Sequence, residues 1–244
     1  MRWGELRIDV ERKSTLALAC IHGDLDAIRS FLQQGVELDQ EDGSGSTPLF
    51  LASLNGQVDV VRVLLDGGAP VEKGRAGGWS PLGIACACGN VDVATLLLER
   101  GADSAAVNTC IAGTTPLLFA CRQQNLDAMH LCVGHGADVK LADTAGTTSL
   151  HVACEMGHVD AARLLLDKGA KVKRADKVGR TPLYIASEYG HVDVVRLLLD
   201  KGAEVDRTME HGVTPLMIAR HKGHSSIVAL LEEHSGSSGG CTVC

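Results

Sequence analysis

Residues 47–69 read TPLFLASLNGQVDVVRVLLDGGA, and this stretch returns along the chain at nearly constant spacing. A leucine marks the same point in every copy, and the intervals between successive leucines are 33, 33, 35, 33, 33 and 33 residues. A fixed period of this length indicates stacked supersecondary units that bury one continuous core between neighbours. The phased leucines are Leu16, Leu49, Leu82, Leu117, Leu150, Leu183 and Leu216.

Each copy predicts two short helices. Thr47 is a suitable N-cap, and Pro48 suits the first helical position because its missing N–H has no helical partner there. Gly56 ends the first helix, and Asp59 opens the second, where negative charge is favourable. A Gly-Ala pair ends the second helix, and a polar, turn-rich segment leads to the next cap.

These features resemble the ankyrin repeat. Its T-P-L-H-x-A signature is close to the residues at 181–186, TPLYIA, and its G-H-V-D element occurs at 157–160 and 190–193. The resemblance implies an all-α ankyrin-repeat solenoid of seven helix-turn-helix units with projecting hairpin loops. We expect the array to span residues 14–234, between an N-terminal leader at 1–13 and a flexible Ser/Gly tail at 235–244. The resemblance also implies a concave face, between the loops and the first helices, that binds a partner.

Several copies depart from the pattern. Gln124 stands where the other copies have the helix-ending glycine, so we expect a strained or altered turn there. The 35-residue interval places two extra residues within 105–112 and lengthens that loop. Arg220 and Glu232 make the last copy polar, as a terminal capping repeat requires.

Composition excludes several classes of function. The formal net charge is −7 and no cluster of Lys and Arg exists, which argues against a nucleic-acid partner. No segment approaches the roughly 20 apolar residues of a membrane span. Four of the nine cysteines fall four residues after a phased leucine, a small buried position, which favours a reduced, cytoplasmic or nuclear protein. Those four are Cys20, Cys86, Cys121 and Cys154.

The sequence contains no catalytic motif, so we predict neither an enzyme nor a cofactor. His158, His191 and His224 occupy one position of the repeat and therefore lie in successive layers, roughly 8–10 Å apart. Ligands lie about 2 Å from a shared zinc ion, so we interpret these histidines as structural. Cys121 is the cysteine we expect nearest to Cys86, and this pairing is a weak zinc candidate.

The pattern predicts a non-catalytic scaffold, adaptor or inhibitor that binds another protein or an extended peptide as a monomer. Residues five and six positions after each leucine differ in every copy and are expected to line the concave face. Aromatic side chains and arginine dominate many interfaces. For Trp79, packing on the neighbouring loop is the competing interpretation. The candidate partner-binding residues are Trp79, Arg122, Met156, Tyr184 and Tyr189.

The last four residues, Cys241-Thr242-Val243-Cys244, have the form of a C-a-a-X motif. They raise an alternative function, a prenylated recruiter tethered to a membrane through Cys241. Residues 225–244 contain no Lys or Arg to support such anchoring, and one lipid chain alone anchors weakly. The competing interpretation is a tail with two reactive thiols.

Overall fold

A computed structural model describes residues 15–111, 113–209 and 212–237, and these form fourteen α-helices in seven pairs. The first helices of the pairs are α1 (Thr15–His22), α3 (Pro48–Leu54), α5 (Pro81–Cys88), α7 (Pro116–Arg122), α9 (Ser149–Glu155), α11 (Pro182–Tyr189) and α13 (Pro215–Lys222). The second helices are α2 (Leu25–Gln33), α4 (Val58–Asp66), α6 (Val91–Glu99), α8 (Leu126–Gly134), α10 (Val159–Asp167), α12 (Val192–Asp200) and α14 (Ser225–Ser237).

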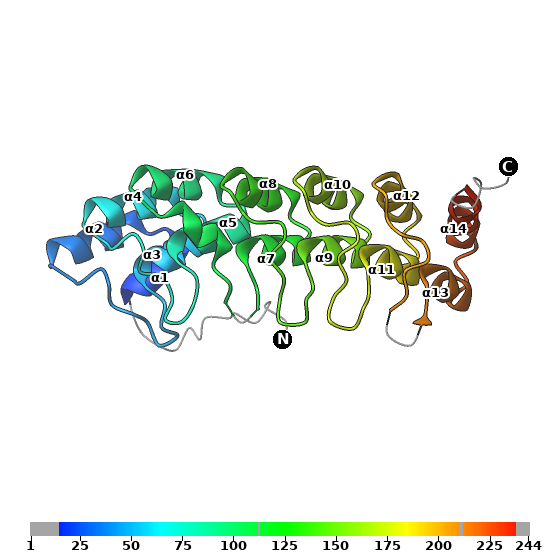
Figure 1. Ribbon diagram of the computed structural model, residues 1–244. Coiled ribbons are helices and arrows are strands. Elements are labelled where there is room, and N and C mark those ends of the chain that lie inside the picture. Colours follow the sequence, from blue (N-terminus) through cyan, green and yellow to red (C-terminus); the bar gives the residue numbers. More distant parts are fainter. Residues whose placement is uncertain (1–14, 112, 210–211, 238–244) are drawn as a thin grey trace.

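The two sets of helices form two rows, and the loops between pairs project from the row of first helices (Figure 1). Each pair stacks on the next, so the molecule is an elongated array. The described residues contain no strand beyond isolated bridges such as Ser46 with Arg75. The predicted all-α solenoid is therefore confirmed.

Capping residues fix where the first helices begin. The Thr47 side-chain oxygen accepts a hydrogen bond from the Phe50 N–H at 3.2 Å, and Pro48 follows at the first helical position. The cap satisfies one of the N–H groups that a helix start leaves without a partner. The same capping bond is made by Ser80, Thr115, Thr148, Thr181 and Thr214.

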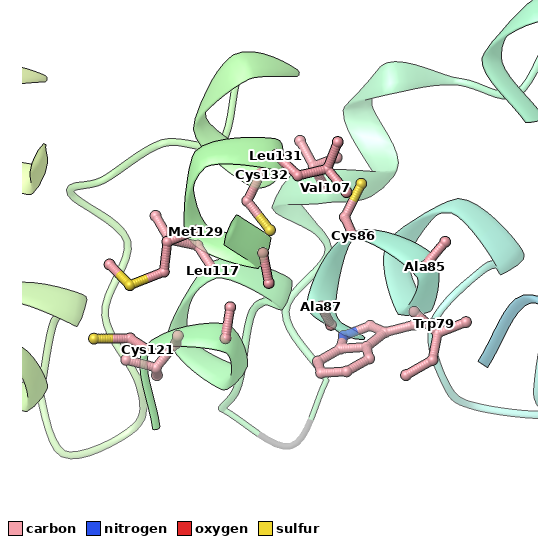
Figure 2. Close-up of a cluster of buried hydrophobic side chains, with 14 of the residues drawn as sticks. Trp79, Ala85, Cys86, Ala87, Val107, Leu117, Cys121, Met129, Leu131 and Cys132 are labelled. Atoms are coloured by element: carbon pink, nitrogen blue, oxygen red, sulfur yellow. The ribbon is translucent and has the colours of Figure 1, made fainter. Parts of the chain in front are cut away.

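Small residues bring the layers close together. The alanine three positions after each phased leucine is buried in all seven copies, from Ala19 to Ala219. Large aliphatic side chains fill the space around it, and Figure 2 shows part of this core, where Leu117 and Met129 pack beside Cys132. Because interiors are close-packed, a larger side chain at the alanine position would separate two layers.

Polar side chains tie five of the seven layers to the layer before them. Asn90, which precedes α6, donates from Nδ2 to the Ser53 carbonyl oxygen at 2.8 Å, at the end of α3. Since the last carbonyls of a helix have no partner within it, these bonds satisfy groups that the fold would otherwise leave open. Equivalent bonds are donated by Gln57, Asn125, His191 and His224.

The irregular junction of the third and fourth copies keeps the stack intact. The extra residues are absorbed by a 3-10 helix, η2 (Ser104–Asn108), whose Val107 is buried. Gln124 adopts a φ of +55°, the left-handed conformation that glycine occupies at this position elsewhere. The turn is therefore unaltered in shape and strained, since a side chain with a Cβ disfavours this region. At the end of the array, α14 continues to Ser237, past His234.

None of the helices within the described ranges is long and apolar enough to cross a membrane.

Candidate partner-binding face

The first helices and the hairpin loops together form one long face, which we call the inner face (Figure 1). Among the described residues, large hydrophobic side chains with high exposure gather on its C-terminal half. Met156 is 41% exposed and Tyr189 48%, while Val178 on the adjoining loop is 44% exposed. Met217 is 56% exposed at the position where Phe50 and Tyr184 are buried, because no described repeat stacks on the last one. Single exposed hydrophobic residues are common on proteins, whereas several on one face are typical of interaction surfaces.

The five candidate residues divide into two groups. Met156, Tyr189 and Arg122 are exposed on the inner face. Trp79 and Tyr184 retain only 7% and 6% of their exposed area, so both side chains belong mostly to the core. Their role as contact residues stays a prediction, and burial leaves each of them little surface to offer. For Trp79 the structure agrees with the competing interpretation, packing within the array.

Arg122 joins two repeats. Its guanidinium lies 2.9 Å from the Asp143 carboxylate, which belongs to the loop before the next first helix. Asp143 also accepts hydrogen bonds from the backbone N–H groups of Ala145 and Thr147, each at 2.9 Å, and so shapes its own hairpin. The ion pair is partly exposed and contributes about 1 kcal/mol or less. Arg122 is thus held in place on the inner face.

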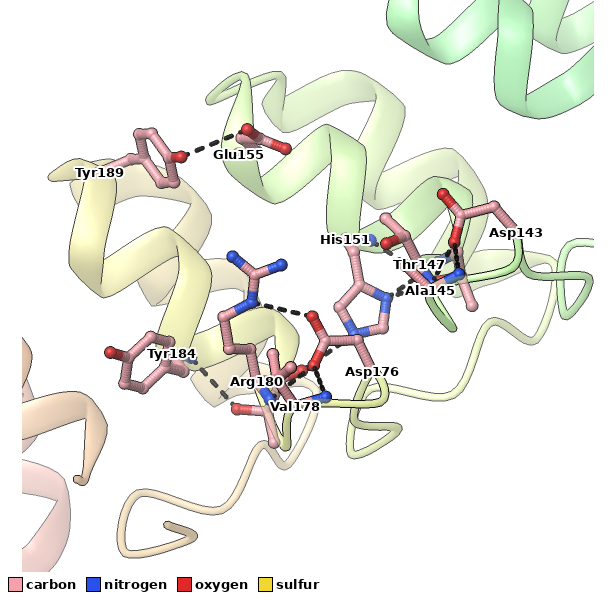
Figure 3. A network of polar contacts seen from close by, with 12 residues as sticks. Asp143, Ala145, Thr147, His151, Glu155, Asp176, Val178, Arg180, Tyr184 and Tyr189 are labelled. Carbon is pink, nitrogen blue, oxygen red and sulfur yellow. Dashed lines mark hydrogen bonds and ion pairs between the residues drawn. The ribbon is translucent and has the colours of Figure 1, made fainter. Parts of the chain in front are cut away.

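Tyr189 is held by the repeat before it. Its hydroxyl donates to the Glu155 carboxylate at 3.3 Å, and its ring stacks on His191 with centroids 6.4 Å apart. The Glu155 charge raises the pKa of Tyr189, and burial and Glu188 add to the shift. Figure 3 shows Tyr189 and Glu155 reaching toward one another from α11 and α9. An oriented ring costs less entropy on binding than a free one.

A polar network below this surface was not predicted from the sequence. Asp176 is buried and accepts hydrogen bonds from the backbone N–H groups of Val178 and Arg180, at 3.1 and 2.8 Å. The Arg180 side chain returns to the same carboxylate at 2.8 Å (Figure 3). An aspartate that opens a turn in three copies, Asp42, Asp143 and Asp176, was the available signal.

His151 completes this network. Its Nδ1 accepts from the Thr148 backbone N–H at 3.1 Å, and its Nε2 donates to the Arg180 carbonyl oxygen at 3.2 Å. These two bonds together assign the neutral tautomer with the proton on Nε2. Burial lowers the pKa of His151, while the Asp176 charge opposes that shift. His151 is therefore structural, fixing a hairpin of the inner face.

The histidines interpreted as structural are structural in the described chain. His191 and His224 donate to the carbonyl oxygens of Glu155 and Glu188, at 2.9 and 3.1 Å. His158 accepts from the Ala161 N–H at 3.4 Å at the start of α10. Within residues 15–111, 113–209 and 212–237 no group of three or more His, Cys, Asp and Glu side chains could hold a metal ion.

The cysteines of the described residues are free thiols, and the expected neighbour of Cys86 was wrong. Cys132 on α8, not Cys121, is the cysteine whose thiol lies beside Cys86 (Figure 2). The neighbouring Cys86 thiol and burial raise the pKa of Cys132. The second helix of a pair leans over the first helix of the preceding layer, which spacing along the sequence does not reveal. Cys241 lies outside the described residues.

The N-terminal half of the inner face is hollowed. A cavity of about 310 Å³ opens between α3, α5, α7 and the hairpin at 75–79. Its apolar lining comes from Phe50, Leu54, Trp79, Ile84, Ile111 and Phe119. Sequence reasoning selected only Trp79 from this set. The available signal was that two of the three phenylalanines of the chain, Phe50 and Phe119, lie in adjoining copies on either side of Gly83.

Comparison with known proteins agrees with this architecture. The sequence model of a family described as ankyrin repeats (3 copies) matches residues 16–108, 104–176 and 174–240. The crystal structure of the human ASB11 ankyrin repeat domain is similar, with a TM-score of 0.78 and 28% sequence identity. The match covers 90% of this chain and 98% of that chain. No curated protein matches the sequence.

Proposed function

The chain belongs to the ankyrin-repeat family, and we propose that it is a non-catalytic interaction module that binds a partner protein or extended peptide on its inner face. In that role it acts as a scaffold, adaptor or inhibitor, because any enzymatic step would come from the partner. Ankyrin repeats generally serve as protein-interaction modules. The proposal adds that the partner contacts the inner face of this array.

One observation carries the proposal. Five large hydrophobic side chains of the described chain are exposed, and three of them, Met156, Val178 and Tyr189, lie on the inner face or its loops in the fifth and sixth repeats. The fourth, Met217, occupies the position of the buried Tyr184, on the outer side of the last described layer. The fifth, Val91, begins α6 in the opposite row. A bias of this kind is expected of a surface that is covered part of the time, since burying apolar area drives association.

Size and rigidity support it as well. Six layer spacings of roughly 8–10 Å give the array a length of about 50–60 Å, enough for an interface of ordinary area. The side chains on this face are held by intramolecular bonds, such as Arg122 to Asp143 and Tyr189 to Glu155. Preorganised contacts reduce the ordering cost of binding.

The test is affinity capture of partners from cells, followed by mass spectrometry, with three forms of the protein. The double variant Met156→Ala with Tyr189→Ala removes two exposed apolar contacts, and Val91→Ala is the matched control on the other row. We expect proteins recovered by the wild type and the control to be lost with the double variant. Equal recovery by all three forms, with equal melting temperatures, would exclude the inner face.

A further inference from the structure

The cavity of the third repeat has an identifiable origin. In most copies a bulky side chain follows the phased leucine, as Phe50 and Leu118 do in the adjoining repeats, but the third repeat has Gly83. A Cβ at Gly83 would lie 3.2 Å from the Trp79 Cβ and 3.4 Å from the Ala106 carbonyl oxygen. The Trp79 side chain therefore occupies the space that a larger residue would fill, and it becomes a wall of the cavity.

The remaining walls hold Trp79 in this place. Phe119 meets the indole edge to face, and η2, in the lengthened loop between the third and fourth repeats, presents Ala106 behind Gly83. The indole Nε1 has no hydrogen-bond acceptor in the described chain, so packing alone positions the ring. The glycine, the tryptophan and the insertion together give the third repeat a hollow on the inner face.

The cavity carries one charged group. Arg75 is the single titratable residue among those lining it, and its Nε donates to the Ser44 carbonyl oxygen at 3.3 Å. Within the described residues no carboxylate forms an ion pair with it, whereas Lys73 nearby is paired with Asp39 and Glu41. The guanidinium at the mouth is thus available for a negative charge brought by a ligand.

We propose that this cavity receives one bulky apolar side chain (Leu, Ile, Met or Phe) of an extended partner segment, and that Arg75 pairs with an acidic residue next to it. The inference rests on the proposed function and narrows it, because it names the chemistry of the partner's anchor. An apolar floor with a single cation at the rim complements an apolar residue flanked by a carboxylate.

The dimensions agree with an anchor of this size. Pockets for small molecules begin at about 300 Å³, so a cavity of about 310 Å³ has room for one large side chain. Binding energy at protein interfaces concentrates in a few large side chains that enter such pockets. Aromatic walls, here Phe50, Phe119 and Trp79, offer dispersion contacts to an aliphatic or aromatic guest without polar groups to desolvate.

The experiment selects a library of random twelve-residue peptides on phage against the full chain. We expect selected peptides to be enriched in a large apolar residue beside Asp or Glu. Leu54→Arg places a charge in the cavity, and Ala76→Phe blocks its mouth from an exposed position without touching the core. Either change is expected to weaken the selected peptides roughly 30-fold or more, the loss of one hot spot.

Further variants test the charge at the rim, the specificity of the effect and binding beside Trp79. Arg75→Gln is expected to reduce affinity only about two- to fivefold and to abolish the preference for Asp and Glu. Val91→Arg, on the opposite row, is expected to change nothing. In the Trp3→Phe protein, Trp79 is the sole tryptophan, and a selected peptide is expected to shift its fluorescence saturably.

The outcomes distinguish the proposed anchor cavity from the broader proposal that the inner face binds a partner. Peptides that lose affinity with Met156→Ala and Tyr189→Ala, but not with Leu54→Arg or Ala76→Phe, would overturn the anchor and leave the inner face as the binding surface. Peptides insensitive to all of these variants would overturn both proposals. A library that yields no binder, or binders without the apolar and acidic pair, also counts against the anchor.

Discussion

The indole of Trp79 meets the ring of Phe119 edge to face, with centroids 5.5 Å apart and an interplanar angle of 87°. The contact joins the hairpin of the third repeat to the first helix of the fourth. Edge-to-face aromatic pairs contribute about 0.5–1.5 kcal/mol beyond the area they bury. Trp79 therefore links two layers at the one place where the repeat interval is lengthened.

Replacing Trp79 should destabilise the array strongly. We expect Trp79→Ala to lower the free energy of unfolding by about 3–5 kcal/mol, because it leaves a cavity and removes the contact with Phe119. Urea unfolding followed by circular dichroism measures the change. Trp79→Phe keeps an aromatic ring against Phe119 and should lose clearly less. An unchanged unfolding midpoint for Trp79→Ala would mean that the indole is not part of the core.

His151 should make stability depend on pH. Burial lowers its pKa in the folded chain, below the value of 6.5 that applies when it is exposed. As the pH falls the unfolded chain therefore takes up the proton first. The contribution of His151 is complete above about pH 6.5 and is lost progressively as the pH falls from there toward the lower folded pKa. Protonation would also turn Nδ1 into a donor facing the Thr148 N–H.

The matched variant is His151→Gln, since glutamine at this position of a helix can still accept from the N-cap backbone. Between about pH 7.5 and 5.5 the wild type should lose more stability in urea unfolding than this variant. Asp176 and Arg174, the charged groups that act on His151, are unchanged in both proteins. Parallel pH profiles would show that another group is responsible.

Much of the fold could be predicted from the sequence because local rules and the repeat agree. Threonine followed by proline begins helices, glycine ends them, and alanine at 0% exposure marks where layers touch. Each of these residues acts within its own repeat or on the next one. Because the same local structure is repeated seven times, few overall arrangements of the helices remain possible.

The partner-binding residues were harder to predict from the sequence, because a residue that differs between copies is not necessarily exposed. Trp79 differs because Gly83 leaves space beside it, and Tyr184 differs yet lies buried against its own array. Arg122 differs because Asp143 in the next loop provides its partner. A residue that compensates for a change in a neighbouring residue differs between copies, just as a residue that contacts a partner does. Only the contacts in the folded structure distinguish these two causes of variation.

The cysteines should differ widely in reactivity. Burial raises the pKa of Cys20 and of Cys121 to about 12, so at pH 8 little reactive thiolate exists. Cys110 is exposed. With iodoacetamide we expect Cys110 to be alkylated at least about a hundredfold faster than Cys20 or Cys121. Peptide mass spectrometry over time measures the rates, and unfolding in urea should make them similar. Equal rates in the native protein would contradict the burial.

Layer packing predicts that substitutions at two nearby positions of α9 differ greatly in their effect on stability. Ala153 is fully buried between layers, and Ala153→Leu would force them apart at a cost of about 1–3 kcal/mol. Glu155 is exposed, so Glu155→Ala should change stability by about 0.5 kcal/mol or less. Thermal unfolding of both variants measures the contrast. Similar melting temperatures would mean that Ala153 does not set the layer spacing.

Gln124 offers the opposite case, a position where a substitution should stabilise the protein. Its φ of +55° is the left-handed conformation, which costs a residue with a Cβ about 1–2 kcal/mol. Glycine removes that strain but gives the unfolded chain more freedom, which offsets up to about 1 kcal/mol of the gain. We expect Gln124→Gly to raise the free energy of unfolding by about 0.5–1 kcal/mol. Urea unfolding measures the difference.

The neighbouring residue supplies the control. Gln123 has a φ of −80°, in the right-handed helical region, so Gln123→Gly gains no relief of strain and should be neutral or destabilising. Gln124→Ala retains a Cβ in the left-handed conformation and should resemble the wild type. If Gln124→Gly instead weakens the protein, the glutamine side chain must stabilise the turn by more than the backbone strain costs.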